Sequence, residues 1–230
     1  MRTKIFFGFV TAGLLFTSML ISAQKTEDRP IGNFTKVSMG ISGDVYISQG
    51  ESPKLTVEAE DEIIGLIVTE VRNDELKIRF SQSRVRTKMP IRIWVTTPEL
   101  EGMYLSGSGN MITETAIKTD EMELKLSGSG NINVKDISCD EMDAAISGSG
   151  NIDVAGKADE LSIEISGSGN CNADEFQTEE TDVRISGSGN CNVNASKDLT
   201  VAVSGSGSVF YVGHPTIDAS ISGSGKIKKL

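Results

Sequence analysis

The tetrapeptide Ser-Gly-Ser-Gly recurs in the second half of the chain at a nearly constant interval. The first glycines of its seven copies are Gly107, Gly128, Gly148, Gly167, Gly187, Gly205 and Gly223, so that successive copies are 18 to 21 residues apart. A chain with 24 glycines does not produce this spacing by composition alone. A fixed period of about 20 residues is typical of repeat proteins, in which one small unit is stacked on the next.

Apolar and polar residues alternate on both sides of each tetrapeptide. Before the second copy, for example, Met122, Leu124 and Leu126 alternate with Glu123 and Lys125. After most copies the alternation resumes over a shorter segment. A period of two with one apolar face predicts half-buried strands. Each unit is therefore predicted to contain a strand, a glycine corner, a second strand and a polar turn.

Such a unit cannot bury its apolar face alone, whereas stacked units share a continuous core between parallel strands about 4.8 Å apart. The sequence thus predicts an all-β fold, a right-handed parallel β-helix or β-solenoid with coils of about 20 residues. A sandwich or propeller is the alternative. Those folds favour antiparallel hairpins, and the strongest hairpin signals, Asn-Gly and Asp-Gly, do not occur in the chain.

Residues 30–100 lack the tetrapeptide but keep the strand pattern. The segment GISGDVYI resembles a degenerate first corner, and its Gly43 precedes Gly107 by 64 residues, which is close to three periods. We expect irregular N-terminal coils or a capping module here, because a solenoid needs atypical ends. The charged segment 81–90 is expected to protrude. At the other end, the three lysines of residues 226–230 are expected to guard the last strand edge against pairing.

Residues 1–23 have the layout of a secretory signal peptide. Two cations precede an apolar run, Ile5–Ile21, and two small residues follow it. A membrane anchor is the alternative, although the run is shorter than the roughly 20 apolar residues of a spanning helix. We expect an exported chain, located in the periplasm, on the outer-membrane surface or outside the cell. Its residues 24–230 are expected to form a single β-helical domain, with regular repeats over 101–230.

Charge and residue counts limit the classes of partner. Removal of Arg2 and Lys4 with the signal peptide would change the formal charge from −10 to −12, which opposes binding to nucleic acid. His214 is the only histidine, so a histidine-based zinc site is excluded. The tetrapeptide is not followed by the Gly-Lys-Ser/Thr of a phosphate-binding loop. We therefore expect no metal and no cofactor.

The residue after the tetrapeptide is asparagine in five copies: Asn110, Asn131, Asn151, Asn170 and Asn190. A neutral amide is a poor calcium ligand on its own. Glycine permits a positive φ and a close approach of backbones. We therefore predict a structural corner, along which the aligned asparagines form a hydrogen-bonded ladder.

Two of the three cysteines occupy equivalent positions in successive units. Cys171 and Cys191 replace Ile132 and Ile152 of earlier units, so they are predicted to face inward on adjacent coils. They are either small apolar core residues or a disulfide between coils. Cys139 falls in a polar turn of another unit and has no evident partner.

A few outward positions are candidates for ligand contact. Trp94 and Tyr104 each lie between two predicted inward residues, and exposed aromatic rings can stack on sugars. Three acidic residues share one outward offset, four residues before their tetrapeptide: Glu123, Asp143 and Asp182. Ser162 holds that position in the intervening unit. This column is either a solvated face or, alternatively, a source of the paired carboxylates that glycosidases use.

The opening NFTKVSMGISGDVYISQG and the recurring SGSGNI-type corners, behind a signal peptide, resemble a bacterial family. It is the putative auto-transporter adhesin head domain named for its G-I-N motif, common in Bacteroidetes-like secreted proteins. The resemblance extends from about residue 30 to the C-terminus. It implies a β-helical fold and an exported or cell-surface location, and it offers no catalytic residues.

We therefore expect a protein that is not an enzyme. It is either an adhesin-like binding protein of the cell surface or periplasm, or a structural component of the envelope. A glycan or an envelope or extracellular protein is the expected partner. The alternative is a polysaccharide-acting β-helix enzyme that uses the outward acidic residues, an analogy at the level of the fold.

Overall fold

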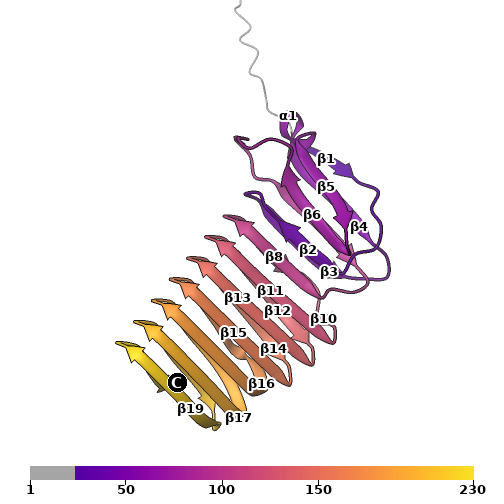
Figure 1. Cartoon of the computed structure of the whole chain (residues 1–230). Helices are drawn as coiled ribbons and strands as arrows, with labels where there is room; N and C mark the ends of the chain where they lie inside the picture. The colour runs from indigo at the N-terminus through magenta and orange to yellow at the C-terminus, as the bar shows by residue number, and fades with distance from the viewer. Residues whose placement is uncertain (1–23) are drawn as a thin grey trace, which may run out of the picture.

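The computed structural model describes residues 24–230, so the predicted signal peptide lies outside the described residues. The chain winds into a stack of β-coils that runs from an N-terminal cap to the C-terminal end (Figure 1). This confirms the predicted β-solenoid with a spacing of about 20 residues between coils.

Twenty strands and one short helix make up the described chain. They are β1 (Gln24–Asp28), β2 (Lys36–Met39), β3 (Asp44–Gln49), β4 (Lys54–Glu60), α1 (Asp61–Ile64), β5 (Ile67–Arg72), β6 (Glu75–Phe80), β7 (Arg92–Thr97), β8 (Gly102–Gly107), β9 (Asn110–Thr113), β10 (Ile117–Lys118), β11 (Glu121–Gly128), β12 (Asn131–Ser138), β13 (Glu141–Gly148), β14 (Asn151–Lys157), β15 (Glu160–Gly167), β16 (Asn170–Gly187), β17 (Asn190–Gly205), β18 (Ser208–Gly213), β19 (Thr216–Gly223) and β20 (Lys226–Lys229).

The strands pair in two parallel ladders, one on each side of the glycine corners. The first ladder joins the segments that precede the corners: β2, β8, β11, β13, β15, the second parts of β16 and β17, and β19. The second ladder joins the segments that follow them: β3, β9, β12, β14, the first parts of β16 and β17, β18 and β20. Equivalent residues of successive coils therefore lie side by side.

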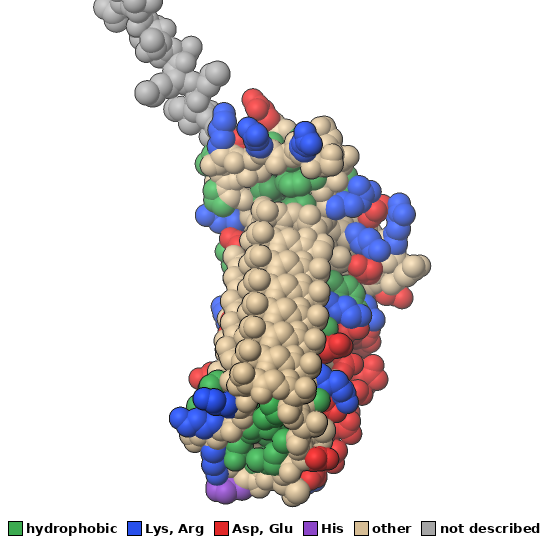
Figure 2. Space-filling model, turned by 60° about the vertical axis from the view of Figure 1, so that its left-hand side comes forward, with side chains coloured by type: hydrophobic (Ala, Val, Ile, Leu, Met, Phe, Trp, Pro, Cys, Tyr) green, Lys and Arg blue, Asp and Glu red, His purple; other side chains and the backbone are tan. Residues whose placement is uncertain are grey.

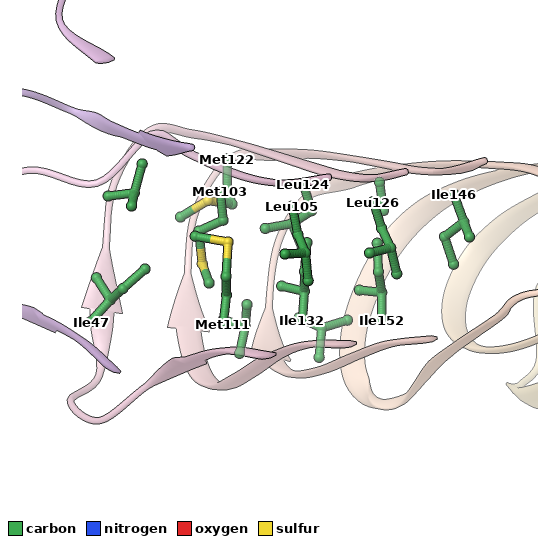
Figure 3. Packing of buried hydrophobic residues seen from close by; sticks show 14 of the residues in the cluster. Ile47, Met103, Leu105, Met111, Met122, Leu124, Leu126, Ile132, Ile146 and Ile152 are labelled. Atoms are coloured by element: carbon green, nitrogen blue, oxygen red, sulfur yellow. The ribbon is translucent and has the colours of Figure 1, made fainter. Parts of the chain in front are cut away.

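The core lies between the two ladders. Inward residues of both ladders point toward one another along the stack, as Leu126 and Ile152 do in Figure 3. Both are at most 1% exposed. Burial of each such side chain stabilises the fold by roughly 1.5 to 3 kcal/mol. The in-register pairing repeats this burial in every coil, so one apolar cluster extends from Phe34 to Val209.

The corner glycines allow the coils to stack at backbone contact distance. Gly148 has φ +142°, and a Cβ atom built on it would lie 2.4 Å from the carbonyl oxygen of Gly128. A Cβ on Gly150 would lie 2.2 Å from the carbonyl oxygen of Gly130. Any larger residue would force neighbouring coils apart at these positions, and φ is unfavourable for an L-residue at Gly148.

The predicted asparagine ladder runs beside these glycines. The side-chain Nδ2 of Asn131 donates to Oδ1 of Asn110 at 2.9 Å, and Asn151 donates to Asn131 in the same way at 3.1 Å. The ladder continues through Asn170 and Asn190. It begins at the degenerate corner, where Asn110 Nδ2 donates to Asp44 Oδ1 at 2.6 Å.

The 64-residue spacing from Gly43 to Gly107 does not correspond to three coils. The amide of Asn110 donates to the carbonyl oxygen of Gly43 at 2.9 Å, and β3 pairs directly with β9. Residues 50–101 are therefore inserted between two neighbouring coils and form a cap: β6 and β7 extend the two ladders in parallel beyond β2 and β3, and β4, β5 and α1 cover the N-terminal end. This cap contains antiparallel pairs, among them the hairpin of β5 and β6.

The three cysteines are free and buried. Cys171 and Cys191 are register partners on adjacent coils, as predicted. A hydrogen bond from the Cys191 thiol to Cys171, together with burial, raises the pKa of Cys191 well above its usual value. Cys139 is only 7% exposed although it lies in a turn. Burial, together with Asp140 and Asp159, raises its pKa to about 12.

Candidate functional site

The structure places the two predicted aromatic contacts on different ladders. Trp94 projects outward from β7, whose register partner β3 belongs to the second ladder. Tyr104 projects outward from β8 in the first ladder. Their neighbours in sequence alternate inward as expected, but the two rings do not form one surface.

Tyr104 instead belongs to a small polar cluster. Its hydroxyl donates a hydrogen bond to Glu123, and the Lys125 ammonium lies 5.3 Å from its ring centroid and forms an ion pair with Glu123. Burial raises the pKa of Glu123, but hydrogen bonds from Lys125 and Tyr104 outweigh it, and the pKa is lowered. Burial and the bond to Glu123 raise the pKa of Tyr104. Glu123 is thus held as a carboxylate.

The predicted acidic column is present on the first ladder. Glu123, Asp143 and Asp182 lie in one row of register partners, with Ser162 between the last two. A second acidic row lies beside it and consists of Glu121, Glu141, Glu160, Glu180 and Asp198. Grooves of about 290 Å³ and 200 Å³ run along these rows. Acidic side chains gather on this flank of the stack (Figure 2).

A different row occupies the outward face of the second ladder. Asn133, Asp153, Asn172 and Asn192 are successive register partners, and we call them the amide row. Asn172 Nδ2 donates to Asp153 Oδ1 at 2.6 Å, and Asn192 Nδ2 donates to Asn172 Oδ1 at 3.1 Å. All four side chains are half-buried, so each presents part of its amide or carboxylate to solvent.

Aromatic residues flank the amide row at both ends. Toward the cap, Tyr46 stacks on Trp94 with ring centroids 5.7 Å apart, and Ile112 connects the pair to the row. Toward the other end, Phe210 is the register partner of Asn192. Seven strand-to-strand steps separate Trp94 from Phe210. At about 4.8 Å a step, the row is roughly 34 Å long.

A groove of about 430 Å³ lies beside the amide row. Its polar lining includes Asn133, Lys135, Asp153, Asn172, Asp174 and Glu175. The groove lies beside the positions where the register shifts in β12, β14 and β16, as it does at a β-bulge. Charged side chains, among them Lys135, Asp174 and Glu175, line the groove together with the amides.

The residues of the amide row are polar members of the alternation that follows each tetrapeptide, but they are not among the candidate residues predicted from the sequence. A signal for them exists, since each is the third residue after the second glycine of its tetrapeptide. Ile112 and Phe210 hold the same offset, and Tyr46 holds it after Gly43 of the degenerate corner. The row is therefore recognisable in the sequence by its constant offset, as the acidic column is.

The described part of the chain contains neither a cluster of metal-binding side chains nor a helix that could span a membrane. Among residues 24–230, no group of three or more histidine, cysteine or acidic side chains is arranged to hold a metal ion. Within the same residues, no helix has the length and apolar character needed to cross a membrane.

Comparisons with known proteins place this architecture in context. No curated protein matches the chain. A crystal structure of a putative adhesin from Bacteroides fragilis superimposes with a TM-score of 0.87 at 27% identity, covering 90% of this chain and 97% of that one. A crystal structure of a putative lipid binding protein from Parabacteroides distasonis superimposes with a TM-score of 0.77 at 27% identity, covering 90% of this chain and 96% of that one. A putative adhesin from Parabacteroides merdae, at 21% identity with 90% and 96% covered, shares the fold with a TM-score of 0.74.

A family model matches residues 33–215, which include the degenerate corner, the cap and all but the last coil. The matched residues carry the glycine corners, the asparagine ladder and the amide row described above. The chain therefore belongs to the family described as putative auto-transporter adhesin, head GIN domain.

Proposed function

We propose that the protein is a non-enzymatic, exported, adhesin-like binding protein, and that it binds an extended glycan along the second ladder. The observation that carries this proposal is the continuous outward row from Trp94 to Phe210. Aromatic rings provide apolar contact area for the faces of sugar rings. Amide side chains both donate and accept hydrogen bonds, so they suit sugar hydroxyls.

The repeat makes this surface suitable for a repeating ligand. One amide or carboxylate per coil recurs at about 4.8 Å, so a chain of similar units meets similar groups at each step. The negative net charge of the chain opposes acidic polysaccharides at long range. A neutral glycan is therefore the class that the row and the charge favour together.

Export is supported by the predicted signal peptide and by the adhesin names of related proteins. One relative of comparable similarity is named a putative lipid binding protein. In this chain the space between the ladders is filled by the continuous apolar cluster. A lipid would have to bind outside that core, and the polar amide row offers it no apolar groove.

The alternative function, a polysaccharide-acting enzyme that uses the acidic column, has less support. A glycosidase needs a carboxylic acid that stays protonated near neutral pH. Glu123 has the opposite environment, because Lys125 and Tyr104 lower its pKa. Asp182 forms an ion pair with Arg184 at 2.8 Å. Glu123 is thus held in its charged form, and Asp182 is engaged in an ion pair.

A glycan array tests the proposal, followed by calorimetric titration of the best neutral oligosaccharide. We expect Trp94→Ala and Asn172→Ala each to weaken binding about tenfold, which corresponds to about 1.4 kcal/mol. Ser162→Ala, an outward residue of the first ladder, is the matched control and should leave binding unchanged. Absence of glycan binding, or equal losses in the control, would reject this surface as the site.

A further inference from the structure

The end of the stack that lies away from the cap exposes apolar side chains whose equivalents are buried. In β17, Leu199 is 1% and Val203 is 3% exposed. Their register partners in β19, Ile217 and Ile221, are 39% and 41% exposed. With Leu230, these are the large hydrophobic side chains that are exposed within residues 24–230. The apolar end is visible at the bottom of Figure 2.

Strand edges are free at the same end. Within the described residues, β19 pairs with β17 and β20 pairs with β18, each along one edge. The outer edges therefore present backbone N–H and C=O groups that have no strand partner in this part of the chain. Such an edge is a template for another strand, and apolar side chains beside it add to the stability of the contact.

The opposite end of the stack does not match this surface. At that end the cap buries Ile63 and Ile64 of α1, and its edge strands β1 and β5, each paired along one edge within the described residues, carry no large exposed hydrophobic side chain. A head-to-tail contact would need open ends of both kinds and would lead to filaments. A contact between two C-terminal ends uses the same patch twice and closes as a dimer. The difference between the two ends thus favours a second copy of this chain as the occupant.

The charges on β19 and β20 favour one way of pairing two such ends. β20 carries Lys226, Lys228 and Lys229, whereas β19 carries Asp218 among serine, threonine and apolar residues. Like charges directly opposite each other across a strand pair are destabilising, and opposite charges are favourable. Pairing of β20 with the β20 of another copy would bring lysines together. Pairing of β20 with β19 about an axis beside the last corner places Lys226 and Lys228 opposite Ser222 and Ser220, with Asp218 diagonal to Lys228.

We propose that a second copy docks end to end, with β19 of each chain antiparallel to β20 of the other. The two-fold axis passes by the last corner, Gly223–Gly225. This arrangement pairs both free edges and buries Ile217 and Ile221 of both chains. In this arrangement the lysines oppose β20–β20 pairing and are compatible with the pairing of β20 with β19.

Analytical ultracentrifugation of the purified chain over a concentration series tests the dimer. We expect a monomer–dimer equilibrium, and Ile221→Asp should raise its dissociation constant at least tenfold, because the dimer would bury an unpaired carboxylate. Lys54→Glu, an exposed lysine of β4 in the cap, is the matched control and should have no effect. A chain that is monomeric at every concentration would overturn the proposal.

A charge exchange distinguishes an effect on the proposed strand pairing from an effect on folding. Lys228→Glu should weaken the dimer about tenfold. Addition of Asp218→Lys to the same chain should restore it, since the exchanged side chains again place opposite charges at diagonal positions of the strand pair. Failure of this rescue, a dimer that neither variant affects, or growth into filaments would each contradict the arrangement.

Discussion

At the scale of single residues, two residue types stabilise the stacked corners in different ways. The glycines let successive backbones approach, as at Gly148, where a Cβ would lie 2.4 Å from the carbonyl oxygen below. The asparagines join the same coils through side-chain hydrogen bonds of 2.9 to 3.2 Å. Neither type can replace the other, because glycine allows the backbones to approach closely, whereas asparagine provides the side-chain hydrogen bonds between coils.

Substitution of one corner glycine should therefore destabilise the whole stack. For Gly148→Ala we expect a loss of at least about 2 kcal/mol in the free energy of unfolding, from the positive φ and the backbone clash. Gly65→Ala is the control, because φ is −71° there and no heavy atom lies within 4 Å of the added methyl group. It should change stability by less than about 0.5 kcal/mol. Denaturant unfolding of both variants measures the difference, and equal effects would contradict the stacking argument.

The Glu123 cluster should make a small, pH-dependent contribution to stability. Because the folded-state pKa of Glu123 is lowered, its contribution is present above the unfolded-state pKa of about 4.3 and is lost as the pH falls through the folded value. Its carboxylate is partly exposed, so we expect Glu123→Gln to cost only about 0.5 kcal/mol at pH 7. Thermal unfolding at pH 7 and pH 3 should show this difference shrinking at the lower pH; a constant difference would mean that charge is not its source.

At the scale of elements, the sequence predicts the regular coils well and the cap poorly. From β8 onward, the alternation and the tetrapeptide spacing act locally, so the strands and their register follow from adjacent units. The cap depends on antiparallel pairings between distant segments, which no repeat records. Its hairpin turns at Asn73 and Asp74, both with positive φ, although neither is followed by the glycine that signals such turns.

The candidate site, too, is predictable from the sequence only in part. The acidic column and the outward position of Trp94 follow from alternation within one unit. The stack of Trp94 on Tyr46 does not, because β3 and β7 become neighbours only through the excursion of the cap. The groove beside the amide row arises from strand bulges, which alternation alone does not locate.

Neighbouring strands of the first ladder place like charges in register. Glu160 lies between Glu141 and Glu180, so Glu160→Gln should stabilise the protein by about 0.5 kcal/mol. Glu164 of the same strand lies between Ala145 and Arg184 and provides a control of opposite sign. Glu164→Gln should be slightly destabilising. Chemical denaturation of the two variants in low salt checks this; a shift of the same sign in both would refute the role of register.

At the scale of the whole molecule, charge is distributed unevenly along the stack. Residues 24–101 contain 13 acidic and 11 basic side chains, whereas residues 102–230 contain 19 acidic and 9 basic ones. The coils thus carry most of the net negative charge, and the last three cations of the chain lie on β20 at the open end. The cap closes one end of the stack, while the coils between the ends present acidic residues on one ladder and amides on the other.

This distribution predicts that salt stabilises the fold. At 0.01 M ionic strength the Debye length is about 30 Å, so the acidic rows of the first ladder repel one another along much of the stack. At about 0.1 M it falls to about 10 Å. If screening recovers about 1 kcal/mol, the melting temperature should rise by about 2 to 4 °C for a chain of this size. Calorimetry at fixed protein concentration in sodium chloride measures the rise. Glu160→Gln should reduce it, because one repulsive step of the row is gone; an unchanged or falling melting temperature would show that other charges dominate.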